Sequence, residues 1–196
     1  MVVLGLTLFV PLNLFAQNSL YIALKPGIYS PRSADLNGFN NGFSGDFTIG
    51  YRFNPNIALE GGFGYFDTGG NKTFTRGASF IQAHYDINVW SLTATLKGIL
   101  PYKKWEFFGL AGGGIYTVSV PYDTNGYHHQ PYPYYYSDYT SVWGGYLGAG
   151  IQYNITPGFF LGVEGKYLWT DDAKYSNVEK FNLDGIISNA IIGFRF

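Results

Sequence analysis

The sequence predicts an all-β protein, an eight-stranded antiparallel up-and-down β-barrel that crosses a membrane. Three observations predict it: eight stretches alternate between apolar and small or polar residues, their connections alternate between short and long, and aromatic residues gather at both ends of the stretches. The composition agrees, with 20% aromatic residues, 27 glycines and only 13% charged residues. Mean hydropathy is -0.01. No run reaches the roughly 18 apolar residues that a membrane-spanning helix needs.

Each stretch has a period of two, so its side chains point alternately to the two faces of a sheet. In the second stretch Phe47, Ile49 and Tyr51 share one face, and Thr48 lies on the other. An apolar outer face and a small or charged inner face fit a barrel wall in lipid. The stretch from 106 to 118 is too rich in glycine for its faces to be assigned. The eight stretches are 20–30, 46–53, 57–66, 87–100, 106–118, 141–153, 159–169 and 185–196.

The connections sort into two classes. Short turns follow the second, fourth and sixth stretches, at 54–56, 101–105 and 154–158. A soluble β-sandwich has no reason to place every long loop at one end, whereas a membrane barrel has short periplasmic turns and long extracellular loops. The long connections are 31–44, 67–86, 119–140 and 170–184.

Aromatic residues form two expected girdles around an aliphatic band, the interfacial pattern of membrane barrels. The lower girdle contains Tyr51, Phe53, Tyr102, Trp105, Tyr153, Phe159, Phe194 and Phe196. The upper girdle contains Phe47, Tyr65, Trp90, Trp143, Tyr167 and Trp169.

The first 16 residues have the pattern of a signal peptide, so we expect the barrel domain to comprise residues 17–196. An apolar core from Val2 to Val10 is followed by Pro11 and by the small Ala16 before polar residues. Cleavage after Ala16 would place the mature chain outside the cytoplasm. The alternative is that this segment is a buried N-terminal strand or helix.

Eight alternating strands, the presumed signal peptide, the glycine-rich strands GLAGGGIY and GGYLGAGIQY, and the terminal GFRF together resemble the OmpA/OmpX-type small outer-membrane β-barrel family. The resemblance implies a bacterial outer-membrane location and insertion by the barrel-assembly machinery, which reads a terminal aromatic residue. Phe196 matches that position. We expect the barrel domain only, without the family's optional peptidoglycan-binding domain. The last strand should pair with the first, because an open edge is not tolerated in lipid.

Six charged residues fall on expected inward faces. An eight-stranded barrel has an interior only wide enough for side chains, so these charges must pair. We interpret them as a plug of salt bridges and water, and a gated ion path is the alternative. The six are Arg52, Glu60, Lys97, Glu164, Lys166 and Arg195.

The third long connection is the candidate recognition surface, because Tyr offers a large amphipathic contact area at a low entropy cost. A loop that packs on itself over the barrel mouth is the alternative, and metal or haem capture by the two histidines is a third reading. The candidate residues are Tyr122, Tyr127, His128, His129, Tyr132, Tyr134, Tyr135, Tyr136 and Tyr139.

The sequence therefore predicts a non-enzymatic, monomeric outer-membrane protein that supports the envelope and contacts an extracellular glycan or protein through its loops. No catalytic residue, cofactor or metal site is predicted, and the expected partners in the membrane are lipid and lipopolysaccharide. The net charge of -1 gives no electrostatic case for nucleic acid, and the absence of cysteine excludes disulfides. The alternatives are a narrow channel for ions or small hydrophobic solutes and a soluble lipocalin-like binding barrel.

Overall fold

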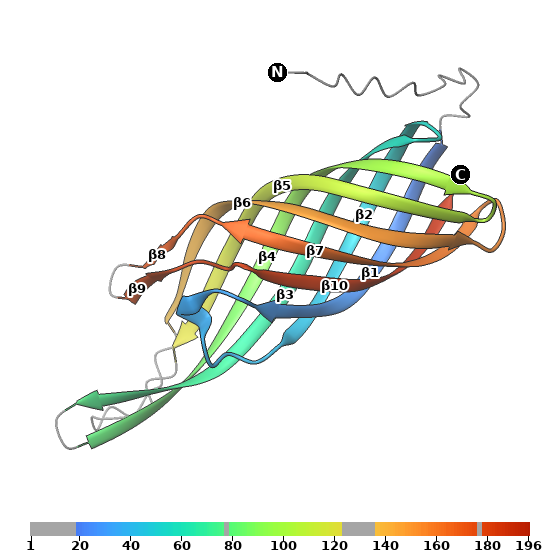
Figure 1. Cartoon of the computed structure of the whole chain (residues 1–196). Helices are drawn as coiled ribbons and strands as arrows, with labels where there is room; N and C mark the ends of the chain where they lie inside the picture. The colour runs from blue at the N-terminus through green and yellow to red at the C-terminus, as the bar shows by residue number, and fades with distance from the viewer. Residues whose placement is uncertain (1–18, 77–78, 123–135, 176–177) are drawn as a thin grey trace, which may run out of the picture.

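The computed structural model describes residues 19–76, 79–122, 136–175 and 178–196, and in these segments eight antiparallel strands close into a barrel (Figure 1). The order around the wall is β1-β10-β7-β6-β5-β4-β3-β2, and β8 and β9 form a separate two-stranded sheet. The predicted fold class is confirmed. The barrel strands are β1 (Ser19–Pro31), β2 (Gly42–Asn54), β3 (Ile57–Arg76), β4 (Ser79–Tyr102), β5 (Trp105–Tyr122), β6 (Tyr136–Asn154), β7 (Phe159–Thr170) and β10 (Gly185–Arg195). Nowhere in the described segments is there a helix long and apolar enough to span a membrane.

Closure of the barrel depends on β1 and β10. Their register runs from Tyr21 opposite Arg195 to Pro31 opposite Gly185, and the Phe196 N–H donates to the Leu20 carbonyl at 2.8 Å. The terminal strand therefore pairs with the first, as predicted. Neither Lys25 nor Pro26 has a partner in the β1–β10 register, although the register itself does not shift there. Proline has no N–H to donate, so the ladder is interrupted at this point of the seam.

Alternation along the strands separates an apolar outside from a filled inside. Outward side chains of β4 such as Leu92, Leu96 and Leu100 are 66%, 56% and 71% exposed, whereas the intervening Thr95 and Lys97 are buried. The structure also assigns the faces of the glycine-rich β5. Its inward row contains Glu106, Phe108, Leu110, Tyr116 and Val118.

The aromatic girdles consist of ring pairs at the two ends of the wall. In the lower girdle Trp105 and Tyr153 have ring centroids 4.7 Å apart, and those of Phe159 and Phe194 are 4.9 Å apart. In the upper girdle the Tyr65 and Trp90 centroids are 4.8 Å apart. Aromatic pairs in such tilted arrangements contribute beyond their buried area, by about 0.5–1.5 kcal/mol each in soluble proteins.

The prediction of a long loop over 67–86 was wrong. β3 and β4 pair residue by residue from Asp67 opposite Asn88 to Arg76 opposite Ser79, so most of this segment is a hairpin that continues the two strands. The backbone groups of each strand that face the other are hydrogen-bonded within the hairpin, and those on the two outer edges are left to water. Both flanks of the predicted third loop are likewise strand, because β5 and β6 pair as far as Tyr122 opposite Tyr136.

The first and fourth connections pack together over one side of the barrel mouth. The first contains the 3-10 helix η1 (Ala34–Leu36), and the fourth contains β8 (Ala173–Tyr175) and β9 (Val178–Phe181). The Arg32 N–H donates to the Asp184 carbonyl at 2.8 Å, and Leu36 and Leu183 are both buried. The described residues of these two connections are therefore packed parts of the fold.

We predict that Phe196→Ala reduces assembly into the membrane. The substitution removes a ring from the lower girdle at the position where the family resemblance places the assembly signal. The fraction that shifts mobility on an SDS gel after boiling, measured on membrane extracts, should fall several-fold. Phe53→Ala is the matched control, since Phe53 is another outward ring of the lower girdle. Equal losses in both variants would mean that Phe196 has no special role.

Candidate functional site in the barrel interior

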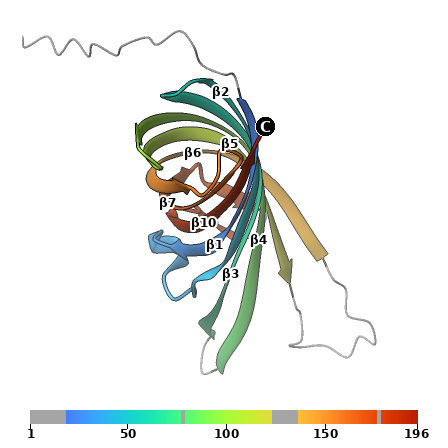
Figure 2. The ribbon, with the colours of Figure 1, turned by 90° about the vertical axis from the view of Figure 1, so that its right-hand side faces the viewer.

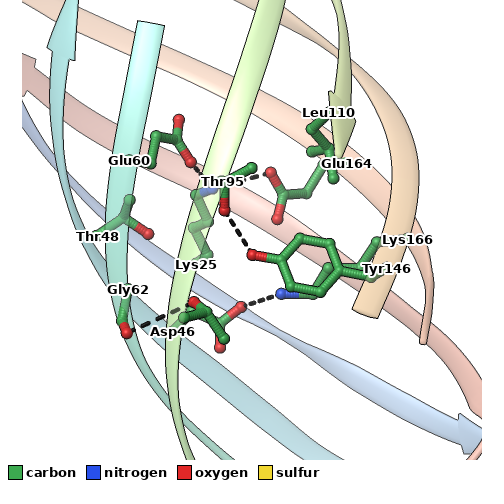
Figure 3. Close-up of a pocket in the computed structure, with 11 residues that line it drawn as sticks. Lys25, Asp46, Thr48, Glu60, Gly62, Thr95, Leu110, Tyr146, Glu164 and Lys166 are labelled. Carbon is green, nitrogen blue, oxygen red and sulfur yellow. Dashed lines mark hydrogen bonds and ion pairs between the residues drawn. The ribbon is translucent and has the colours of Figure 1, made fainter. Parts of the chain in front are cut away.

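The centre of the barrel is held by one cation between two carboxylates (Figure 3). Lys25 Nζ on β1 lies 3.0 Å from Glu60 Oε2 on β3 and 3.0 Å from Glu164 Oε2 on β7. The three side chains are 5%, 2% and 1% exposed. In the wall, β1 pairs with β10 on one side and with β2 on the other; β7 lies beyond β10, and β3 lies beyond β2. The two ion pairs therefore connect strands that do not pair with each other, across the interior.

Glu60 accepts hydrogen bonds from three buried side chains. It accepts from the Tyr21 hydroxyl at 2.6 Å and from Lys97 Nζ at 3.3 Å, in addition to Lys25. Lys97 Nζ also donates to Gln152 Oε1 at 3.2 Å and lies 3.8 Å from the centroid of the Phe108 ring. A buried carboxylate is tolerated when several donors satisfy it, as here.

A second ion pair lies beside the first. Lys166 Nζ is 2.6 Å from Asp46 Oδ2, and the Asn189 side-chain amide donates at 3.3 Å both to Asp46 Oδ2 and to Glu164 Oε1. Asn189 therefore links the two groups of charges into one network. The Tyr146 and Thr95 hydroxyls hydrogen-bond to each other on the same layer (Figure 3).

A third cluster lies near the end of the barrel with the short turns. Arg52 binds Glu106 in a bidentate pair, with nitrogen–oxygen distances of 3.2 and 2.7 Å. Glu106 also accepts from Gln152 at 2.7 Å, from Asn154 at 3.0 Å and from Arg195 at 3.5 Å. The surplus of donors over carboxylate oxygens explains why Nε of Arg52 and of Arg195 are the two buried side-chain polar atoms without a hydrogen-bond partner among the described residues.

The structure places all six sequence-predicted charged residues in this interior network. It adds three that the sequence analysis missed, Lys25, Asp46 and Glu106. The alternation of the second stretch places Asp46 on the same inward face as Thr48. The alternation of the first stretch, with Leu20, Ile22 and Leu24 outward, places Lys25 inward. Glu106 begins the glycine-rich stretch, whose faces the sequence did not reveal. The nine residues comprise five basic and four acidic side chains, so the net formal charge of the network is smaller than that of the six predicted residues, which comprise four basic and two acidic side chains.

The interior is filled as well as charged. The free volume beside Lys25, Asp46, Glu60 and Glu164 is ≈ 10 Å³, at the lower limit for one water molecule. Aromatic rings fill the interior on either side of this layer. The Tyr21 ring packs edge-on against the Phe160 ring, with centroids 6.0 Å apart, and the Tyr29 and Phe66 centroids are 4.5 Å apart. The arrangement leaves no space for a substrate among these residues.

The candidate recognition residues fall mainly outside the described segments, which exclude Tyr127, His128, His129, Tyr132, Tyr134 and Tyr135. Tyr122 and Tyr136 occupy the paired ends of β5 and β6, and Tyr139 on β6 is 66% exposed. In the part of the chain that the structure describes, no group of three or more His, Cys, Asp or Glu residues could hold a metal ion.

Comparisons with known proteins agree with this architecture. The sequence model described as outer membrane protein beta-barrel domain matches residues 2–185. No curated protein matches the chain. The solved structures that it resembles include OprG of Pseudomonas aeruginosa (TM-score 0.60, 12% identity, 91% of this chain and 96% of that one). The neisserial surface protein NspA is another (TM-score 0.55, 16% identity, 91% of this chain and 94% of that one). Ail of Yersinia pestis, solved with the heparin analogue sucrose octasulfate, is also similar (TM-score 0.50, 18% identity, 91% of this chain and 99% of that one). At these identities the likeness shows the fold alone.

We predict that Lys25→Met destabilises the barrel by about 3–5 kcal/mol, since it leaves Glu60 and Glu164 with one buried cation fewer. The midpoint temperature of the heat-dependent mobility shift should fall accordingly. The double variant Lys25→Met with Glu164→Gln keeps the charge balance and should recover most of the loss. If the single and double variants are equally destabilised, packing of the Lys25 side chain and not its charge is what matters.

Proposed function

Because the chain belongs to the family of outer-membrane protein β-barrel domains, and is therefore a protein of the bacterial outer membrane, we propose that it is a non-enzymatic surface-contact protein. The barrel is the anchor, and the contact surface lies on the hairpins that project from it. The observation that carries this proposal is the β3–β4 hairpin, which extends past the other strands at the end opposite the C terminus (Figure 1).

Strand pairing joins the hairpin to the wall only near its base. β3 pairs with β2 only as far as Phe66, and a single further bridge joins Gly70 to Phe39. β4 pairs with β5 only from Asn88 onward. The segment from about Asn71 to Ile87 is therefore a two-stranded ribbon, apart from residues 77–78, which lie outside the described segments. An isolated ribbon of this kind is only marginally stable in water. A partner that covers its free edges or faces would supply the missing stabilisation.

The extended ends of β5 and β6 form a second projection, which points away from the β3–β4 hairpin (Figure 2). The tyrosine-rich segment 119–140 begins and ends on this second projection. Tyrosine-rich loops suit recognition of glycan or protein surfaces. That Ail was solved with a heparin analogue supports the proposal by showing that a barrel of this fold can bind a glycan mimic.

A channel role is less well supported. The interior at Lys25 is occupied by ion-paired side chains and has room for about one water. A lipocalin-like soluble barrel is excluded by the outer-membrane family and by the apolar outer surface. Insertion by the barrel-assembly machinery and a monomeric state remain part of the proposal.

Replacing residues 123–135 with Asn-Gly tests the recognition surface. Tyr122 and Tyr136 already pair, so a two-residue turn can close the hairpin without disturbing the wall. Cells carrying this variant should lose most of the wild-type binding to an array of immobilised glycans and extracellular-matrix proteins. A variant with Asn-Gly in place of Lys103 and Lys104, the two-residue turn between β4 and β5 at the other end of the barrel, controls for the turn itself. Unchanged binding in the 123–135 variant would remove the tyrosine-rich segment from the contact surface.

We predict that the wild-type protein in planar lipid bilayers gives no unit conductance steps, because the ion-paired layer around Lys25 fills the interior. The measurement is single-channel recording of detergent-purified protein whose folding has been checked by its heat-dependent mobility. Reproducible steps that disappear when the protein is left out would overturn the closed interior.

A further inference from the structure

We infer that the cluster of Arg52, Glu106 and Arg195, near the short-turn end of the barrel interior, binds one small monovalent anion of the halide class. The three side chains are 10%, 6% and 18% exposed. Two independent features of the cluster, its charge and its unused hydrogen-bond donors, point to the same kind of ligand. The inference goes beyond the proposed surface contact and does not depend on it.

The excess charge of the interior network lies entirely in this cluster. The ion pairs around Lys25 and Lys166 join three lysines to three carboxylates, so that part of the network is formally neutral. These six residues are Lys25, Lys97, Lys166, Asp46, Glu60 and Glu164. Among the described residues, Glu106 supplies every ion pair of Arg52 and of Arg195. One positive charge is therefore left without a counter-charge, in a place where burial makes that costly.

The donors of the cluster also outnumber its acceptors. Glu106 accepts two hydrogen bonds from Arg52, and three more come from Gln152, Asn154 and Arg195. A carboxylate offers about four lone-pair sites, so Glu106 has no capacity for a further donor. Within the described segments, Nε of Arg52 and Nε of Arg195 are the buried side-chain polar atoms that have no partner. An anion would satisfy both the unused N–H groups and the excess charge.

The two guanidinium groups lie close enough to share one ion. Nη2 of Arg52 and Nη2 of Arg195 lie 2.7 and 3.5 Å from the same oxygen, Glu106 Oε2. The buried Phe160 ring, whose centroid is 5.6 Å from Arg195 Cζ, offers no acceptor of its own. A single ion beside Glu106 is therefore attracted by both arginines.

The surroundings select a small ion that enters from the end with the short turns. The excess is one charge and the interior is closely filled, so a halide fits better than a phosphate or a carboxylate ligand. Arg195 is the most exposed of the three side chains and belongs to the last strand, close to the chain end. An ion can reach it from this end without passing the ion-paired layer around Lys25.

The first test is crystallography of the folded protein in detergent, with bromide as the probe. Bromide scatters X-rays anomalously and is thereby distinguished from water. We expect one anomalous peak within hydrogen-bond distance of Arg52 Nε, Arg195 Nε or both. Density at this place without an anomalous signal would show that water satisfies these atoms, and it would overturn the inference.

The second test measures whether the anion stabilises the fold in solution. Thermal unfolding in a non-ionic detergent is followed by circular dichroism, in sodium chloride and in sodium gluconate at equal ionic strength. Chloride at tenfold its dissociation constant should raise the wild-type midpoint temperature by about 3–6 °C relative to gluconate. Arg195→Gln removes the excess charge and one unused donor, so this difference should disappear.

Lys104→Gln is the matched control, because it removes one positive charge from an exposed position in the turn between β4 and β5, at the same end of the barrel. It should respond to chloride as the wild type does. An equal response in all three proteins would be a general salt effect and would overturn the site, as would the absence of a response in the wild type. If Arg195→Gln does not fold, the bromide measurement on the wild type decides.

Discussion

The structure depends on the closure of the wall by β1 and β10. In a bilayer no water is available to satisfy backbone groups, so a sheet with a free edge is not tolerated and the strands must pair in a ring. The pairing of Tyr21 with Arg195 and the hydrogen bond from Phe196 to Leu20 complete that ring at the last residues of the chain. Once the ring is closed, the alternation of each strand decides which side chains face lipid and which fill the interior.

A narrow closed ring then determines what the interior can contain. Most inward charged side chains are buried, and a buried charge must find an opposite charge and further donors. Lys25, Glu60 and Glu164 meet this requirement from three strands that are distant in sequence. The same network connects separate parts of the wall, so the group that neutralises the charges also braces the barrel. The interior therefore leaves no room for a ligand among these residues, and the proposed contact surface lies on the projecting hairpins.

Much of the architecture could be predicted from the sequence because period-two alternation is a local property. The eight strands, the short turns at one end, the two girdles and the inward position of residues such as Lys97 all follow from it. The alternation does not show where a strand ends when pairing continues into solvent, and this is why the predicted loop over 67–86 is wrong. Glu106 was missed for a different reason. Glycines have no side chains to mark a face, and only pairing with neighbouring strands reveals the orientation.

The ribbon formed by β3 and β4 makes the protein modular. β3 pairs with β2 only as far as Phe66, and β4 pairs with β5 only from Asn88 onward. Beyond these residues, apart from the bridge between Gly70 and Phe39, the described strand pairs join only β3 and β4. Residues added to or removed from the ribbon in matched pairs leave every wall contact and every interior ion pair in place. The outer tip can therefore change in length and sequence while the membrane anchor stays the same, and the tip is the natural position for displaying a foreign peptide on the cell surface.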